Sequence, residues 1–245
     1  MLIEPEINSC ANQVTAHFFT KAVTTQQAIT KTTQLSKSFN MDVFSKNCTG
    51  RVAAEQFIKQ GFKKTYRANI SISMPQVLTI NTGNFKAALG IRSANSPLFI
   101  EQYLPCPIEK TSALANKNIP REKIVEIGCL YSNANRFTIP LFLVTAISLF
   151  YQGYSHLVFS GTEKVLNIIS KAEIDFAHLC NAKQSLLTPS SDDWGNYYET
   201  NPKVALIALS SVIKAINKQP RYKKSFESLD VKIAHVCNQL GTCQW

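Results

Sequence analysis

Residues 124–162 of the chain read IVEIGCLYSNANRFTIPLFLVTAISLFYQGYSHLVFSGT. IVEIGCLYS at 124–132 and HLVFSGT at 156–162 are short apolar runs, which is typical of buried strands. The apolar run FTIPLFLVTAISLFYQG at 137–153 has the length of a helix. A strand, a helix and a strand in close succession predict parallel neighbours joined by a right-handed crossover. This stretch therefore predicts an α/β fold.

The helix predicted at 137–152 has almost no polar face. No Asp, Glu, Lys or Arg lies between Arg136 and Glu163, so a membrane span is one interpretation. A span needs about twenty apolar residues, and Gln152 and Gly153 end this run at about fifteen. A helix buried against a sheet is the better interpretation.

The residues before this stretch predict a helix followed by a β-meander. After Arg51 the sequence VAAEQFIKQGFKKTY has helical spacing, and its apolar stripe contains Ala53, Ala54, Phe57, Ile58 and Phe62. QVLTINT at 76–82, KAALGIRS at 86–93 and PLFIEQYL at 97–104 are short and strand-like. We therefore expect three meander strands after the helix.

The residues after residue 162 predict two more helices and a strand. VLNIISKAEI at 165–174 has helical spacing, and DFAHLC at 175–180 is strand-like. KVALIALSSVIKAINKQ at 203–219 predicts a last amphipathic helix that ends before Pro220. The predicted fold class is α/β (α+β), a mixed sheet flanked by helices.

Composition and charge suggest three segments. Residues 1–48 are rich in Thr, Gln, Ser and Lys and predict a disordered, flexible tail. Residues 50–215 form the expected domain, and residues 216–245 a basic extension. The net charge is +10, but residues 71–202 hold ten basic and ten acidic residues, so the excess lies in the flanks. With no nucleic-acid-binding motif beside it, this charge predicts no nucleic-acid partner.

The seven cysteines are odd in number and never spaced C-x-x-C, which predicts neither zinc nor another bound metal. Their scatter fits a reducing compartment, and a Cys237–Cys243 bridge is the alternative. The first residues, MLIEPEINSC, lack the apolar run of a secretory signal. We therefore expect a cytoplasmic protein, or one secreted by a non-standard route.

Several longer motifs resemble the thermostable hemolysin family over about residues 50–210. They are Leu89-Gly90-Ile91-Arg92, Pro97 to Leu104, Pro107-Ile108-Glu109, Ile124 to Gly128, and Trp194-Gly195-Asn196-Tyr197-Tyr198. The resemblance implies an association with haemolysis, the lysis of blood-cell membranes. The element order also resembles the GNAT fold and, more closely, the acyl-homoserine-lactone synthases, which transfer an acyl group from a thioester carrier to an amine.

The synthase resemblance implies that Arg92 and Glu126 are the catalytic residues. Glu126 alternates with Val125 and Ile127, so it points toward a pocket or toward a partner, and as a general base it could deprotonate an attacking amine. The alternative is a structural ion pair of Glu126 with Arg92 or Arg121. The synthases have an arginine where this chain has Cys129.

Residues 132–136, Ser-Asn-Ala-Asn-Arg, stand where GNAT proteins have a glycine-rich phosphate loop. Free N–H groups at a helix start attract anions, so Asn133, Asn135 and Arg136 are candidate ligands for the phosphates of a thioester cofactor. The alternative is that Asn135 caps the helix and Arg136 faces water.

Five further residues are candidate substrate contacts. Glu101 and Tyr103 would share one face of a strand. Trp194, Tyr197 and Tyr198 follow a polar loop and would form either a lid over an acyl chain or a packing cluster. The histidines show no metal-site spacing.

Two functions follow from the sequence. One is a hemolysin-family protein whose GNAT-like core transfers an acyl group from acyl-CoA or an acyl-carrier thioester, with no tightly bound cofactor, to a small amine. The alternative is a purely intracellular acyltransferase without lytic action. The expected partners are an acyl carrier and a membrane surface. The amphipathic helix at 203–219 would either lie in the membrane interface or, as amphipathic helices mostly do, cover the sheet, and the second interpretation is the better one.

Overall fold

The computed structural model describes residues 39–242 except 191 and 219, together with the backbone but not the side chains of residues 220–228. Residues 1–38 of the tail predicted at 1–48, and Cys243 of the alternative disulfide, lie outside the described residues. The main elements are β1 (Asn40–Ser45), α3 (Arg51–Tyr66), β2 (Gln76–Asn81), β3 (Phe85–Ser93), α4 (Ser112–Ala115), β4 (Ile124–Ser132), α5 (Thr138–Tyr151), β5 (His156–Gly161), α6 (Glu163–Lys171), β6 (Ala177–Asn181), β7 (Lys203–Ala208), α7 (Leu209–Lys218) and α8 (Pro220–Thr242).

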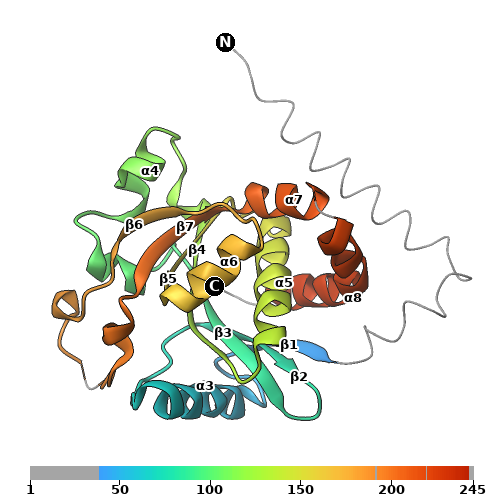
Figure 1. The fold of residues 1–245 in the computed structure, drawn as a ribbon, viewed down its shortest axis with the longest axis horizontal. Coiled ribbons are helices and arrows are strands. Elements are labelled where there is room, and N and C mark those ends of the chain that lie inside the picture. The colour runs from blue at the N-terminus through green and yellow to red at the C-terminus, as the bar shows by residue number, and fades with distance from the viewer. Residues whose placement is uncertain (1–38, 191, 219, 243–245) are drawn as a thin grey trace, which may run out of the picture. The chain divides into compact units, whose positions relative to one another are not determined.

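The strands form one mixed sheet in the order β1-β2-β3-β4-β5-β7-β6 (Figure 1). β1 to β4 are antiparallel neighbours, and β4 and β5 are the parallel pair that the sequence predicts. β7 lies between β5 and β6 and is antiparallel to both. The α/β fold of a mixed sheet flanked by helices is confirmed.

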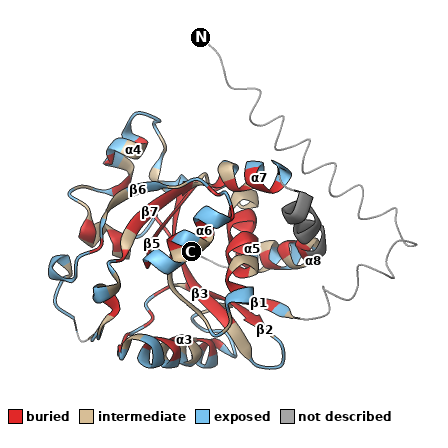
Figure 2. Cartoon of the chain, in the orientation of Figure 1, coloured by how far each residue is buried: buried red, intermediate tan, exposed pale blue. Residues whose placement is uncertain are grey.

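One face of the sheet is covered by α5, α7 and α8. α5 is buried on nearly every side, as Figure 2 shows, because it lies between the sheet and α8. The interpretation as a buried helix is therefore confirmed. Among the described helices, none combines the length and the apolar character that a membrane crossing requires.

The ends of the folded part lie beyond the predicted boundaries. Residues 40–45 belong to strand β1 rather than to the predicted tail, because Met41 and Val43 alternate inward onto the core. The segment predicted as a basic extension contains helix α8, which packs on the core. Its apolar residues 229, 233, 236 and 240 recur at helical spacing and are buried. The side chain of Gln239 in α8 accepts the N–H of Val43 at 2.8 Å, so α8 also protects the edge of β1.

Two other predicted elements are wrong. PLFIEQYL is not a strand: Phe99–Tyr103 is a 3-10 helix, η1, and β4 takes the expected place beside β3. The carboxylate of Glu101 accepts the N–H of Leu98 and so stabilises a turn there. The predicted helix at 203–219 is strand β7 followed by helix α7, since the continuously apolar VALIA suits a central strand.

The other face of the sheet has two hydrophobic clusters. Ile58 and Phe62 of α3 belong to the first, and Ile100 and Leu114 of the 94–123 segment belong to the second. Glu126 projects from β4 on this face, where the two clusters meet, since its neighbours Val125 and Ile127 pack on the α5 side. The fold thus places the Glu126 carboxylate in the interior, at the boundary between the two hydrophobic clusters.

Candidate functional site

The site lies where the two parallel strands of the sheet diverge. β4 and β5 pair only over Ile124–Glu126 and His156–Val158, although they continue to Ser132 and Gly161. Beyond the paired residues, a cavity of about 60 Å³ is lined by Ile127, Gly128 and Cys129 of β4 and by Ser160 of β5. The divergence therefore opens the middle of the sheet to a ligand.

A β-bulge shapes β4 beside this cavity. The register between β3 and β4 shifts between Ala88 and Gly90, and Cys129 has a positive φ of 52°. An extra residue in one strand bends that strand and redirects its side chains. Burial raises the pKa of the Cys129 thiol to about 12, so this cysteine stays protonated at neutral pH and is no thiolate nucleophile.

Glu126 is the buried ionisable group of the site, with 1% of its surface exposed. One carboxylate oxygen accepts the N–H of Phe99 and the other that of Ile100, both at 3.0 Å. Burial raises the pKa of Glu126 to about 7, although the two N–H donors and Arg92 oppose the shift. At neutral pH the carboxylate can accept a proton and release it again, as a general base requires.

Arg92 lies directly across the β3–β4 ladder from Glu126. Its guanidinium is 3.8 Å from the Glu126 carboxylate, and it also donates to Ser73 and to the carbonyl of Pro97. The two residues that the synthase resemblance selects are therefore neighbours, as one sequence interpretation proposes. Arg92 does not line the cavity, so its contacts are with Glu126 and the surrounding backbone.

Aromatic rings enclose the cavity. Its lining includes Phe62, Phe99, Tyr103, Trp194 and Tyr197. The ring of Trp194 lies 5.6–5.8 Å from those of Phe99, Tyr197 and Tyr198. The predicted aromatic segment thus packs as a cluster and also contributes to the cavity wall.

Tyr198 supports this wall from behind. Its hydroxyl is 2.5 Å from that of Tyr103, which lines the cavity. Burial raises the pKa of Tyr198 to about 12 and raises that of Tyr103 further, so both remain neutral hydroxyls. The pair joins the 3-10 helix η1 to the 194–198 segment.

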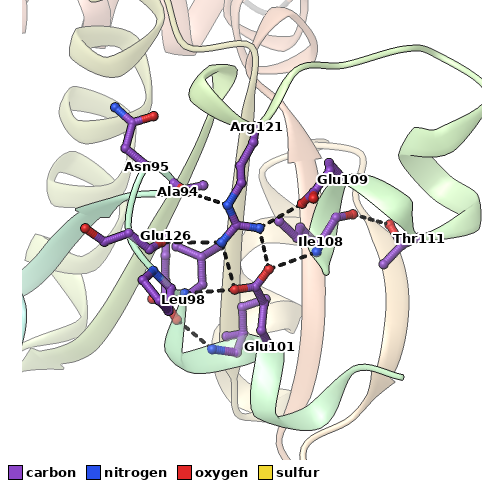
Figure 3. Close-up of polar contacts among 12 residues, drawn as sticks. Ala94, Asn95, Leu98, Glu101, Ile108, Glu109, Thr111, Arg121 and Glu126 are labelled. Carbon is purple, nitrogen blue, oxygen red and sulfur yellow. Dashed lines mark hydrogen bonds and ion pairs between the residues drawn. The ribbon is translucent and has the colours of Figure 1, made fainter. Parts of the chain in front are cut away.

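Glu101 faces away from the cavity, toward Arg121 (Figure 3). Arg121 holds both oxygens of Glu101 at 2.6 and 2.8 Å, and it also contacts Glu109 at 2.7 Å and the carbonyl of Ala94 at 2.5 Å. The prediction that Glu101 and Tyr103 share a strand face is wrong, because they lie on η1. Arg121 is paired with Glu101 and Glu109, so the alternative of a Glu126–Arg121 ion pair is also wrong.

The three phosphate-site candidates lie outside this cavity. Asn133 and Arg136 are exposed, and Asn135 lines a separate open hollow together with Lys164 and Lys171 of α6. No side-chain hydrogen bond caps α5, which begins at Thr138, so Asn135 is not its cap. The guanidinium of Arg136 lies 4.8 Å from the centre of the Phe137 ring. The loop remains a candidate for phosphate binding.

Four polar residues of the cavity wall, Ser71, Ser73, Ser160 and Asp192, were not predicted. The carboxylate of Asp192 accepts the N–H and the hydroxyl of Ser71 at 2.8 and 3.2 Å. The alternation in ISISM at 70–74 is a sequence signal for an extended segment that carries the two serines. No local pattern indicates that Asp192, more than a hundred residues away, meets them.

The comparisons with known proteins agree with this geometry. The family model of thermostable hemolysin matches residues 44–213. The chain belongs to the thermostable hemolysin family. No curated protein matches this hemolysin-family chain.

Solved structures share the fold of this hemolysin-family chain at low identity. FeeM, an N-acyl amino acid synthase from uncultured soil microbes, is 12% identical, with a TM-score of 0.50 over 76% of this chain and 98% of its own. The acyl-homoserine-lactone synthase LasI is 14% identical, with a TM-score of 0.49 over 70% and 90%. BjaI, a CoA-dependent synthase of the same class, is 11% identical, with a TM-score of 0.49 over 74% and 89%. The likeness to FeeM is one of fold alone.

We expect Arg121→Met to lower the free energy of unfolding by about 2 kcal/mol at pH 7, because it leaves two partly buried carboxylates without their cation. Burial alone would raise the pKa of Glu101, but Arg121 and two backbone N–H groups hold it below 4.5. This stabilisation is present above the pKa of the unfolded chain and is lost as pH falls through the folded pKa. Urea unfolding should therefore show a larger difference between the variant and the unaltered protein at pH 7 than at pH 3.

The matched control is Lys110→Met, which removes one positive charge from an exposed side chain next to the cluster. It should change the free energy of unfolding by less than about 0.5 kcal/mol. Equal stability of the two variants at pH 7 would contradict a structural role of Arg121.

Proposed function

We propose that the chain transfers an acyl group from a CoA or carrier-protein thioester to a small amine, with Glu126 as the general base. The observation that carries this proposal is the buried carboxylate at the edge of a cavity, where two parallel strands diverge in a GNAT-like sheet. The 12%-identical N-acyl amino acid synthase shares this fold. A shared fold alone does not define a reaction, so the proposal rests on the site.

The proposed step balances as an aminolysis. The amine nitrogen attacks the thioester carbonyl, a C–N bond forms and the C–S bond breaks. The proton leaves nitrogen for Glu126 and then passes to the thiolate, so the products are an amide and a free thiol. With a pKa of about 7, Glu126 suits both transfers near neutral pH.

Each part of the site has a role in this proposal. The divergent ends of β4 and β5 would admit the thioester, and the 132–136 loop at the start of α5 would contact its phosphates. Arg92 would position the Glu126 carboxylate from the opposite strand, 3.8 Å away. The aromatic wall would exclude water from the reacting atoms.

The same chemistry offers a route to lysis. An amide that joins a fatty acyl chain to a polar amine is an amphiphile, and such a product could lyse membranes. The direct route through the predicted membrane helix at 203–219 loses its support, because that helix does not form and Val212 and Ile216 of α7 face the core. We therefore favour lysis by the product.

The test incubates purified protein with an acyl-CoA and a panel of small amines, and follows free thiol together with the mass of the product. Erythrocytes are then exposed to the protein alone, to the complete reaction, and to the extracted product. Thiol release that depends on both substrates, with lysis by the extract, would support the proposal. Lysis by the protein alone, without thiol release, would contradict it.

We expect Arg136→Ala to weaken acyl-CoA binding by about tenfold to a hundredfold, since a charge-assisted contact to phosphate contributes roughly 1.5–3 kcal/mol. Arg136 is exposed, so the melting temperature should hardly change. Isothermal titration and a thermal melt measure the two effects. The control Lys86→Ala removes a positive charge from β3 near the same loop, and equal affinities of the two variants would make Arg136 a bystander.

A further inference from the structure

Among the residues that the structure describes, those lining the cavity beside Glu126 include negative groups and no positive one. The two acidic side chains among them are Glu126 and Asp192, and none of the described lining residues is a lysine or an arginine. The lining hydroxyls of Ser71, Ser73 and Ser160 can accept or donate hydrogen bonds but carry no charge. A ligand in the cavity therefore contacts carboxylate and hydroxyl groups.

The walls of the cavity favour a cation as well. Five aromatic side chains line it, and the face of an aromatic ring attracts a positive charge. Trp194, a residue type whose ring binds cations more strongly than that of Tyr or Phe, follows Asp192 by two positions and lines the same cavity. Rings and carboxylates together form the type of enclosure that recognises ammonium groups.

The nearest arginines are already engaged. Arg92 donates to Ser73 and to the Pro97 carbonyl, and it faces Glu126. Arg51, buried at the start of α3, donates to Glu55 and to the carbonyls of Phe44 and Met74. A carboxylate in the cavity would face Glu126 and Asp192 without a cation to pair with, which is unfavourable in a poorly solvated site.

The size of the cavity limits the group that enters it. Its volume of about 60 Å³ admits only one end of a small ligand. An ammonium group with one or two carbons fits this space, whereas an amino acid adds a carboxylate on the carbon next to its nitrogen. Both size and charge therefore select against amino acids.

We infer that the cavity between β4, η1 and the 192–197 segment binds the ammonium end of a small amine that carries no carboxylate, between the aromatic rings and the Asp192 carboxylate. This inference rests on the proposed function for the role of the amine as acyl acceptor. It deepens that function by excluding α-amino acids as the preferred acceptors. Glu126 would then take one proton from the bound ammonium group and release it to solvent before the nitrogen attacks. It would take the second proton as the C–N bond forms and pass that one to the thiolate.

The test compares ethanolamine with serine, which differ only by the carboxylate. Binding is measured without acyl donor, through the fluorescence of Trp194 in a Trp245→Phe background, because these are the two tryptophans of the chain. Ethanolamine should give a saturable change with a Kd at least about tenfold lower than that of serine. Equal or tighter binding of serine would overturn the inference.

Asp192→Asn tests the carboxylate itself. The amide oxygen can still accept the Ser71 N–H, so the segment keeps that contact while its charge is lost. The Kd for ethanolamine should rise by about tenfold. Asp193→Asn is the matched control, because Asp193 accepts the N–H of Gly195 and does not line the cavity. Equal affinities of the two variants would contradict the assignment.

A parallel assay with octanoyl-CoA separates this inference from the proposed function. Selective ethanolamine binding without thiol release from either amine would refute the acyl transfer and leave the ammonium site standing. Thiol release with equal kcat/KM for serine and ethanolamine would support the transfer and refute the ammonium site. Preference for ethanolamine in both assays is the expected result.

Discussion

Glu126→Gln should lower kcat/KM for acyl transfer by about a hundredfold or more, which is the usual contribution of a general base. The amide has no site of suitable basicity for the proton of the attacking amine. In the unaltered protein the rate should also rise with pH through about 7, as the raised pKa of Glu126 requires, and the variant should lack this limb. Thiol release between pH 5.5 and 8.5 measures both effects.

A stability measurement distinguishes the base from a structural carboxylate. The pKa of Glu126 rises from 4.5 in the unfolded chain to about 7, so the folded state retains a proton between these values and its stability falls as pH rises through this window. The expected loss is about 3 kcal/mol, and Glu126→Gln should remove this slope. A variant that lost the slope and kept full activity would show that Glu126 is not the base.

Glu109→Gln provides the matched control for the activity measurement. It makes the same chemical change at a partly buried glutamate that pairs with Arg121, on the side remote from the cavity. Arg121 keeps both of its contacts to Glu101 in this variant. Its kcat/KM should stay within about twofold of the unaltered protein, since Glu109 does not line the cavity.

Local patterns were sufficient to predict the centre of the fold. The run from 124 to 162 gives β4, α5 and β5 because each is apolar, bounded by polar or glycine-containing turns, and of the right length. The alternation of Glu126 with Val125 and Ile127 also predicts that its side chain points away from theirs, toward a pocket or a partner. In the structure Val125 and Ile127 pack in the core on the α5 side, and Glu126 lines the cavity. These features depend on contacts between near neighbours.

The two wrong predictions of secondary structure, at 97–104 and at 203–219, share a physical cause that local patterns do not contain. PLFIEQYL at 97–104 has the composition of a strand, but Glu126, more than twenty residues away, accepts the N–H groups of Phe99 and Ile100 and favours a 3-10 helix. VALIA at 204–208 has helical continuity with the next residues, but pairing with β5 and β6 on both sides makes it a strand. Long-range hydrogen bonds override local preference in both cases.

Long-range contacts also limit how much of the candidate site can be predicted from the sequence. The Glu126–Arg92 pair follows from the register of adjacent strands, whereas the contact of Asp192 with Ser71 joins residues 121 positions apart. Glu126→Gln also loses one hydrogen bond, because both carboxylate oxygens accept backbone N–H groups and an amide nitrogen cannot. We therefore expect a modest packing cost beside the loss of the base.

Gly195→Ala should lower the free energy of unfolding by about 3 kcal/mol and abolish most of the activity. Gly195 has a φ of 52°, and a Cβ added there would overlap the carbonyl oxygen of Tyr66 at the end of α3. That carbonyl accepts the N–H of Asn196 at 2.9 Å, so the segment would have to leave α3 and displace Trp194 from the cavity wall. Urea unfolding and thiol release measure the two losses.

Gly83→Ala is the control that separates the steric overlap of a Cβ at residue 195 with Tyr66 from the cost of a positive φ. Gly83 also has a positive φ, of 92°, but a Cβ there would meet nothing within 4 Å. Its substitution should therefore cost only about 1 kcal/mol and leave kcat/KM unchanged. If Gly195→Ala matched Gly83→Ala in both measurements, the contact between the 194–198 segment and α3 would not be what holds the aromatic wall over Glu126. If Gly195→Ala lost activity but was as stable as Gly83→Ala, the aromatic wall would have moved without destabilising the core. That result would still show that catalysis requires the wall.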